Sequence, residues 1–235
     1  MCSSDLKVIR VPLNSKHEHD VKAMAAASPN AGVIYICNPN NPTGTITKRA
    51  DIEWLLANKP KGSILLLDEA YIHLSEEAFG TDMVAKDGEL IVLRTFSKLY
   101  GMAGLRAGAA IGRPDLLAKL SSYGAGALPL TGMVGAAASL KSPKLVPERR
   151  KLIADTRNDV FDFLSKHNAK FVPSVSNKFM LEWDKPGGEL VKAFAKEKIF
   201  IGRVWPAWPK HARVSIGTPE EMAKFKTAYK KIFGV

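Results

Sequence analysis

Cysteine is scarce in this sequence, long apolar runs are absent, and the basic residues form no cluster. The two cysteines, Cys2 and Cys37, have no cysteine or histidine partners at metal-ligand spacing, so the sequence predicts neither a disulfide framework nor a metal site. No stretch reaches the roughly 20 apolar residues that cross a bilayer, and the start lacks the basic-then-apolar pattern of a secretory signal. We therefore expect a cytoplasmic protein in a reducing compartment, without a membrane partner.

Acidic residues are fewer than basic ones: the sequence has 23 Asp and Glu against 34 Lys and Arg, which gives a net charge of +11. The basic residues are scattered along predicted helices, which favours a solvated basic surface over a nucleic-acid site. A positive field of this kind favours anionic small molecules as ligands. The 235 residues, 46% apolar and 24% charged, suit a globular protein of one large domain or two modest ones.

The first two-thirds of the chain alternates short apolar runs with helical patterns, which is typical of parallel strands joined by crossover helices. Several runs are nearly all apolar, as expected of strands covered on both faces. Strands are predicted at residues 7–13, 32–37, 63–68, 89–94 and 105–111, and helices at 47–58 and 113–121. The sequence thus predicts an α/β fold with a mostly parallel sheet over residues 1–142.

A smaller α+β domain is predicted for residues 143–235, because Pro143 and Pro147 interrupt the chain before a long amphipathic helix. Further strands are predicted at 170–172, 178–183, 199–202 and 213–216, with a helix at 188–196. Thr218 and Glu221 match a capping box, with Pro219 in the first turn. A last helix is therefore expected there, with Met222, Phe225, Tyr229 and Ile232 as its buried stripe.

Three predicted strands end in segments rich in chemically active side chains. The segments are NPNNPTG at 38–44, DEAY at 68–71, and TFSK at 95–98 followed by GMAGLR at 101–106. Taken singly they resemble a turn, a helix cap and a solvated loop lysine. In an open parallel sheet, however, ligands bind beyond the carboxyl ends of the strands. Together the segments would place several groups in one pocket: an amide, a carboxylate with a phenol, and a set of two hydroxyls, a lysine and an arginine.

These segments and RVSIGTPEE at 213–221 resemble the signature stretches of pyridoxal-phosphate (PLP) aminotransferases of class I and II, fold type I, of the histidinol-phosphate-aminotransferase-like kind. The similarity covers nearly the whole chain from about residue 7 onward. It implies the large-domain fold of the PLP transferases and pyridoxal 5'-phosphate as cofactor. It also implies transamination between an amino donor and a 2-oxo acid acceptor, in a homodimer.

The resemblance assigns a role to each matching residue of the cofactor site. Lys98 would form an imine with the cofactor aldehyde and, once released, carry a proton as general acid and base. Asp68 would hold the proton on the pyridine nitrogen by a charge-assisted hydrogen bond. Asn41 and Tyr71 would donate to the phenolate oxygen of the cofactor. The phosphate would be bound by Thr95, Ser97 and Arg106.

Substrate binding is assigned to two arginines by the same resemblance. Arg213 would clamp the substrate α-carboxylate in a bidentate pair. Arg203 lies roughly where histidinol-phosphate aminotransferases place an arginine that meets the substrate phosphate, so histidinol phosphate is a candidate substrate. Trp205 and Trp208 depart from the pattern there; they either line a pocket for an aromatic side chain or serve as packing.

Family members carry a long segment before the part that is matched here, so we expect an amino-terminally truncated chain. The letters CSSDL at residues 2–6 match one reading frame through a sequencing adapter, which makes an assembly artefact our hypothesis for the start. Two other functions stay open. One is a different PLP reaction, such as decarboxylation or C–S bond cleavage, and the other is an inactive fragment or a regulatory scaffold.

Overall fold

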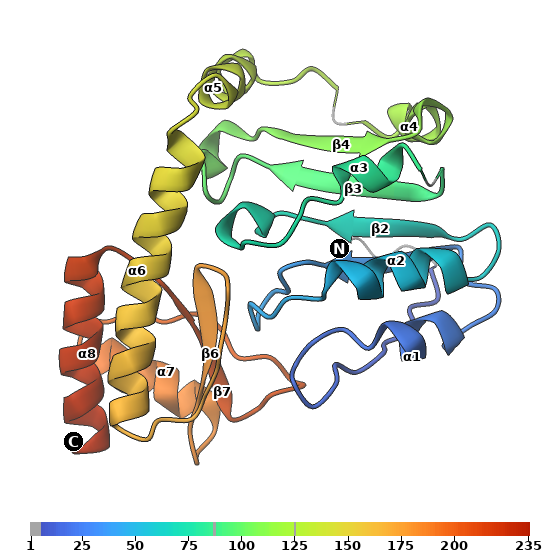
Figure 1. The fold of residues 1–235 in the computed structure, drawn as a ribbon. Helices are drawn as coiled ribbons and strands as arrows, with labels where there is room; N and C mark the ends of the chain where they lie inside the picture. The colour runs from blue at the N-terminus through green and yellow to red at the C-terminus, as the bar shows by residue number, and fades with distance from the viewer. Residues whose placement is uncertain (1–5, 87, 125) are drawn as a thin grey trace.

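The computed structural model describes residues 6–86, 88–124 and 126–235, so residues 2–5 of the CSSDL segment lie outside the described residues. It contains two sheets, one of four strands and one of three, with the long helix α6 (Leu145–Lys166) running past both (Figure 1). The fold is α/β with a mostly parallel sheet, as the sequence predicts, and the second sheet belongs to the carboxyl-terminal part.

The larger sheet consists of β1 (Val33–Cys37), β2 (Ile64–Asp68), β3 (Leu90–Thr95) and β4 (Gly108–Gly112), in that spatial order. The first three strands are parallel, so β1 to β3 end at the same edge. Strand β4 is antiparallel to β3, because residues 96–107 return the chain with only the short 3₁₀ helix η2 (Ala103–Leu105) and no crossover helix. The segments that follow β1, β2 and β3 therefore lie at one edge of the sheet.

Helices α1 (Val21–Ala26) and α2 (Arg49–Asn58) pack with the larger sheet, whereas α3 (Thr81–Val84), α4 (Pro114–Ser121) and α5 (Leu130–Leu140) lie nearer β3 and β4 (Figure 1). The predicted face of α2 is buried, with Ile52, Leu55 and Leu56 in one apolar cluster with the strands. The apolar strands of the sheet supply most of that cluster, in agreement with their sequence pattern.

The smaller sheet is antiparallel and contains β5 (Phe171–Val172), β6 (Lys178–Glu182) and β7 (His211–Ser215). Its core is formed with α6, α7 (Gly187–Lys196) and α8 (Pro219–Phe233), and the fully buried Phe179 and Phe194 belong to it. The predicted capping box of α8 is confirmed, since Thr218 accepts a hydrogen bond from the Glu221 N–H and Glu221 accepts one from the Thr218 N–H.

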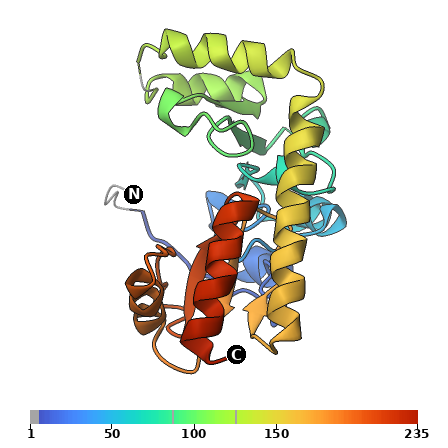
Figure 2. The same ribbon diagram turned by 90° about the vertical axis from the view of Figure 1, so that its left-hand side faces the viewer.

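Helix α6 contributes side chains to two apolar clusters. Leu145 and Ile153 pack with Tyr71 beside the larger sheet, whereas Val160 and Leu164 belong to the core of the smaller one. Figure 2 shows the helix spanning both parts of the molecule. Pro147 lies inside its first turn and does not interrupt it, because N–H groups there have no intrahelical partner. The division of the chain at residue 143 stays a prediction.

Two predicted strands are wrong. Residues 7–13 form no strand; the described pairing of this segment is a single bridge between Leu13 and His19, and Val8 and Ile9 are exposed. An alternating pattern of apolar residues does not form a strand unless a neighbouring strand bonds to its backbone N–H and C=O groups. Residues 199–202 also lack strand structure, because Ile199 still completes the end of α7 through its N–H to Phe194 and only Gly202 bonds directly to β7.

Within the described ranges, every helix is too short or too polar to cross a membrane. The same residues contain no grouping of three or more His, Cys, Asp or Glu side chains arranged to hold a metal ion.

Candidate functional site

The loop after β1 is shaped by hydrogen bonds among its own polar side chains. The buried Asn38 donates from Nδ2 to the Thr47 carbonyl at 3.0 Å and accepts from the Thr47 N–H at 2.8 Å. Asn40 donates to Thr43 Oγ1 at 2.8 Å, and its carbonyl accepts from the Gly44 N–H. These bonds fix the backbone of the NPNNPTG segment and leave the side chain of Asn41 exposed at the site.

Gly44 brings this loop into direct contact with the smaller sheet. Its φ of +72° lies in the left-handed region, and a Cβ there would overlap the Ser174 side chain and lie 2.8 Å from the Lys178 carbonyl oxygen. The Gly44 carbonyl accepts from the Val175 N–H at 3.0 Å. Glycine is therefore required for the close approach of the two parts of the molecule.

Arg213, on β7, crosses from the smaller sheet to this loop. Its Nη1 donates to Asn41 Oδ1 at 3.0 Å, which leaves the Asn41 amide nitrogen available as a donor. Its Nε is buried without a hydrogen-bond partner among the described atoms. The guanidinium carbons of Arg213 and Arg203 lie 5.4 and 5.5 Å from the ring centre of Trp205. Two guanidinium groups thus adjoin one indole, and one of them has unused hydrogen-bonding capacity.

Asp68, the last residue of β2, is held by two donors. Tyr35 Oη donates to Asp68 Oδ2 at 2.7 Å, and the Ala70 N–H donates to Oδ1 at 3.0 Å. Burial raises the pKa of Tyr35, so its phenol stays protonated and remains a donor. Tyr35 was missed in the sequence; as a polar-tipped residue two positions before the end of an apolar strand, it carries only a weak signal.

The next residue, Glu69, is structural. It is 1% exposed and accepts hydrogen bonds of 2.7 Å from Arg94 Nε and from the Gly80 N–H. The guanidinium of Arg94 also lies 4.3 Å from the ring centre of Phe79. The two carboxylates of the DEAY segment thus point into different surroundings, and only Asp68 reaches the cavity described next.

A cavity of about 450 Å³ lies beyond the ends of β2 and β3. Its lining includes five of the predicted site residues, which are Asp68, Thr95, Ser97, Lys98 and Arg106. The Ser97 N–H donates to Thr95 Oγ1 at 3.1 Å, which turns the chain after β3. Arg106 has a φ of +56° and donates from Nη1 to the Ala103 carbonyl at 2.7 Å. A carboxylate, an amine, two hydroxyls and a guanidinium therefore share one cavity.

Tyr71 lies beside this cavity between two lysines. Its ring centre is 5.4 Å from Lys98 Nζ and 3.0 Å from Lys178 Nζ. Burial raises the pKa of the phenol, so the hydroxyl is protonated at neutral pH. Lys178 was not found by sequence reasoning, because a lysine at the start of a strand resembles a solvated residue.

The nine predicted site residues fall into three groups in the structure. Five line the cavity, and Tyr71 lies beside it, since its ring centre is 5.4 Å from Lys98 Nζ. Arg213 is close enough for its charge to act on the Tyr71 phenol, and it bonds to Asn41. Arg203, the ninth, lies beside Arg213: its carbonyl accepts from the Arg213 N–H, and its guanidinium adjoins the same Trp205 ring. The roles that the resemblance assigns to these residues stay predictions.

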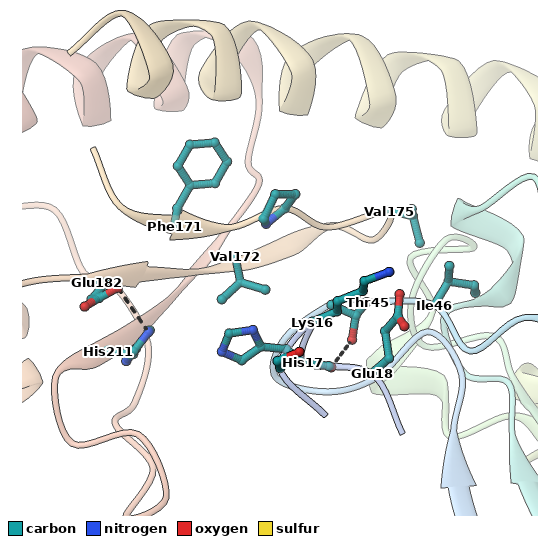
Figure 3. Close-up of a pocket in the computed structure, with 12 residues that line it drawn as sticks. Lys16, His17, Glu18, Thr45, Ile46, Phe171, Val172, Val175, Glu182 and His211 are labelled. Atoms are coloured by element: carbon teal, nitrogen blue, oxygen red, sulfur yellow. Dashed lines mark hydrogen bonds and ion pairs between the residues drawn. The ribbon is translucent and has the colours of Figure 1, made fainter. Parts of the chain in front are cut away.

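A second cavity, of about 540 Å³, lies between residues 15–18 and the smaller sheet. Figure 3 shows His17 and His211 extending toward it, with Glu182 beside His211 at an Nε2–Oε2 distance of 3.9 Å. Burial lowers the pKa of His211, which favours the neutral imidazole. None of the predicted site residues lines this cavity.

Comparison with known proteins identifies a family for this chain. The family model "Aminotransferase class I and II" matches residues 2–228. A histidinol-phosphate aminotransferase of Symbiobacterium thermophilum is 32% identical over 233 residues, covering 97% of this chain and 64% of that protein. An aromatic amino acid aminotransferase of Mycobacteroides abscessus is 34% identical, covering 94% and 65% respectively. The chain thus spans a little under two thirds of the length of these curated relatives.

Structural comparison gives the same result. A crystal structure from Erwinia carotovora atroseptica, classed provisionally as a histidinol-phosphate aminotransferase, superimposes with a TM-score of 0.92 at 29% identity. The match covers 97% of this chain and 68% of the other. The matching family model extends over nearly the whole sequence and includes every strand that borders the first cavity. This chain belongs to the class I and II aminotransferase family.

Proposed function

We propose that this chain is the cofactor-bearing part of an aminotransferase that uses pyridoxal 5'-phosphate. The observation that carries the proposal is that Asp68 and Lys98 line one cavity. The family relationship supports it, because aminotransferases of class I and II depend on this cofactor.

The side chains of the cavity match the chemical groups of that cofactor. A pyridine nitrogen requires an acceptor for its proton, and Asp68 is a carboxylate already oriented by Tyr35. A phosphate requires hydroxyl and cationic donors, and Thr95, Ser97 and Arg106 are of those types. When bound, the cofactor supplies an aldehyde that reacts with amines and a ring that takes up an electron pair from the substrate α carbon.

Lys98 has two tasks in the proposed reaction. Its Nζ holds the cofactor covalently before substrate arrives, and afterwards it moves a proton at the substrate α carbon. Asp68 keeps a proton on the ring nitrogen, which favours electron uptake by the ring. The Tyr71 hydroxyl and the free Asn41 amide would donate to the ring oxygen of the cofactor. Lys98 and Asp68 line the cavity, and Tyr71 lies beside Lys98.

Arg213 binds the α-carboxylate of the substrate in this proposal. The support is its buried Nε without a partner, since a carboxylate would complete the hydrogen bonding of the guanidinium. Arg203 would meet a distal anionic group. We propose an amino acid or an amino-phosphate as substrate, with a 2-oxo acid as acceptor, and histidinol phosphate as the leading candidate. Histidinol phosphate carries a phosphate and no carboxylate, so in that substrate the phosphate would take the place of the carboxylate at the arginines. Aromatic side chains are a second candidate, favoured by Trp205 beside both arginines.

The test starts from the purified chain incubated with pyridoxal 5'-phosphate. We expect a visible absorbance band of the lysine-bound cofactor that is abolished in Lys98→Ala and retained in Lys119→Ala, a control on the exposed face of α4. Histidinol phosphate, glutamate and aromatic amino acids are then added separately, and the spectrum is followed as the cofactor is aminated. Absence of the band in the unaltered protein refutes the proposal. Release of carbon dioxide, or of a thiol together with ammonia, would assign another PLP reaction.

The oligomeric state and the cellular location stay predictions. A homodimer is expected from the family, and several exposed apolar side chains on and near α5 are compatible with a covered face there, among them Leu128, Leu130 and Val134. The cytoplasmic location is likewise an expectation.

A further inference from the structure

Lys178 is a buried ammonium at the edge of the candidate cofactor site. It opens β6, is 3% exposed, and donates to Ser176 Oγ at 3.0 Å. In the described part of the chain it forms no ion pair with a carboxylate. Its Nζ lies instead 3.0 Å from the ring centre of Tyr71. Burying a charge without a counter-ion is unfavourable, so its presence beside a site residue calls for a functional explanation.

The ionisable groups around Lys178 come from several elements that meet at the site. The groups that act on it are Cys37 at the end of β1, Asp68 on β2, Lys98 after β3 and Arg213 on β7. Lys98 and Arg213 carry the same sign as Lys178, whereas Asp68 carries the opposite one. Burial, the largest influence, lowers the pKa of Lys178 to about 7. Its charge is therefore sensitive to pH in the range where an enzyme works.

We propose that Lys178 is a positioning residue of the cofactor site that acts through Tyr71. The proposal rests on the function proposed above. A cation over an aromatic face is attracted to the ring and withdraws electron density from it, which makes the phenol a stronger hydrogen-bond donor. The ammonium also adds positive charge close to Lys98, which disfavours a further proton on the nitrogen that holds the cofactor. Both effects favour the unprotonated form of the lysine–cofactor linkage.

A structural role for Lys178 is the competing explanation. Its aliphatic stem fills space between the two sheets, and a chain of similar shape would do the same without a charge. The two roles are distinguished by replacing the charge and the shape separately. Lys178→Met keeps most of the shape and removes the charge; Lys178→Arg keeps the charge.

The decisive measurement is a pH titration of the visible absorbance of the cofactor-loaded protein. We expect the midpoint to rise by about 0.5–1 pH unit in Lys178→Met and to stay near the unaltered value in Lys178→Arg and in the exposed control Lys170→Met. An unchanged midpoint in Lys178→Met overturns the proposal. Lys178→Gln replaces the Met variant if the latter does not fold, because glutamine is neutral and can still bond to Ser176.

A second measurement, on the cofactor-free protein, separates this proposal from the proposed function. In protein with ¹³C-labelled tyrosine, the Tyr71 ring signal is identified by its loss in Tyr71→Phe. It should move with a midpoint near pH 7 in the unaltered protein and lose this step in Lys178→Met. If no cofactor band forms but the step is present, the proposed function fails while the Lys178–Tyr71 coupling stands. If the band forms and the step is absent, the coupling fails alone.

Discussion

Acidification should destabilise the fold through His73, because this imidazole is held neutral beside two guanidinium groups. His73 belongs to the short 3₁₀ helix η1 (Ile72–Leu74). Its Nε2 lies 3.2 Å from Arg94 Nη1, and its carbonyl accepts a 2.7 Å hydrogen bond from Arg150 Nε. Burial, followed by the charges of Arg94 and Arg150, lowers the pKa of His73 to about 4.

The direction of the effect follows from which state binds the proton. The unfolded chain takes up a proton at His73 near its ordinary pKa of about 6.5, whereas the folded chain does so only near about 4. Stability is therefore fully present above about pH 6.5 and is lost as the pH falls from there toward about 4. At about pH 5 the difference covers about 1.5 pH units, and about 1.4 kcal/mol per unit gives a loss of about 2 kcal/mol.

The assay is urea unfolding followed by circular dichroism at about pH 7.5 and about pH 5, for the unaltered chain and for His73→Gln. The pH-dependent loss of unfolding free energy should be about 2 kcal/mol smaller in the variant. His19 and His211, whose pKa values burial also lowers, contribute equally to both proteins and cancel in the comparison. An identical pH dependence in the two proteins would show that folded His73 accepts a proton readily, and the reasoning from burial would then be wrong.

Two further predictions concern local geometry. Gly44→Ala should lower the free energy of unfolding by about 1–3 kcal/mol, because alanine at a φ of +72° is strained and its Cβ would overlap Ser174. Urea unfolding measures this change. An unchanged unfolding midpoint would contradict the requirement for glycine at this close approach. Thr218→Ala should cost about 1 kcal/mol through loss of the α8 cap, whereas Thr218→Ser, which keeps the hydroxyl, should stay near the unaltered value in the same assay.

The sequence predicted best those elements whose signals are local. The apolar runs that became β1, β2 and β3 were identified from their composition alone. The expected cover on both faces is wrong for β1, where Val33 and Tyr35 are exposed. The capping box of α8 needs only residues within one turn, and it was found with the correct start. Helix α5 was missed, since LTGMVGAAASL is small and apolar throughout and shows no polar face to set a helical period.

Features that depend on distant partners were predicted less well. The strand expected at residues 7–13 has a suitable pattern but no described neighbour to pair with. The Asn41–Arg213 hydrogen bond joins residues 172 positions apart, and only the family resemblance suggested that they act at one site. The burial of Lys178 arises where β6 meets the loop after β1, so nothing near it in the sequence distinguishes it from a surface lysine.

The residues that line the cavity and the arginines proposed to bind substrate come from different parts of the molecule, which the sequence does not show. The cavity residues, from Asp68 to Arg106, all come from the larger sheet and its loops. The contacts Asn41–Arg213, Tyr71–Lys178 and Gly44–Ser174 each join that part to the smaller sheet. A change that loosens the junction of the two sheets should therefore disturb the proposed carboxylate clamp and the charge beside Tyr71 before it disturbs the cavity. Because the clamp and the cavity depend on different contacts, loss of substrate binding with retained cofactor binding is the expected signature of damage at this junction.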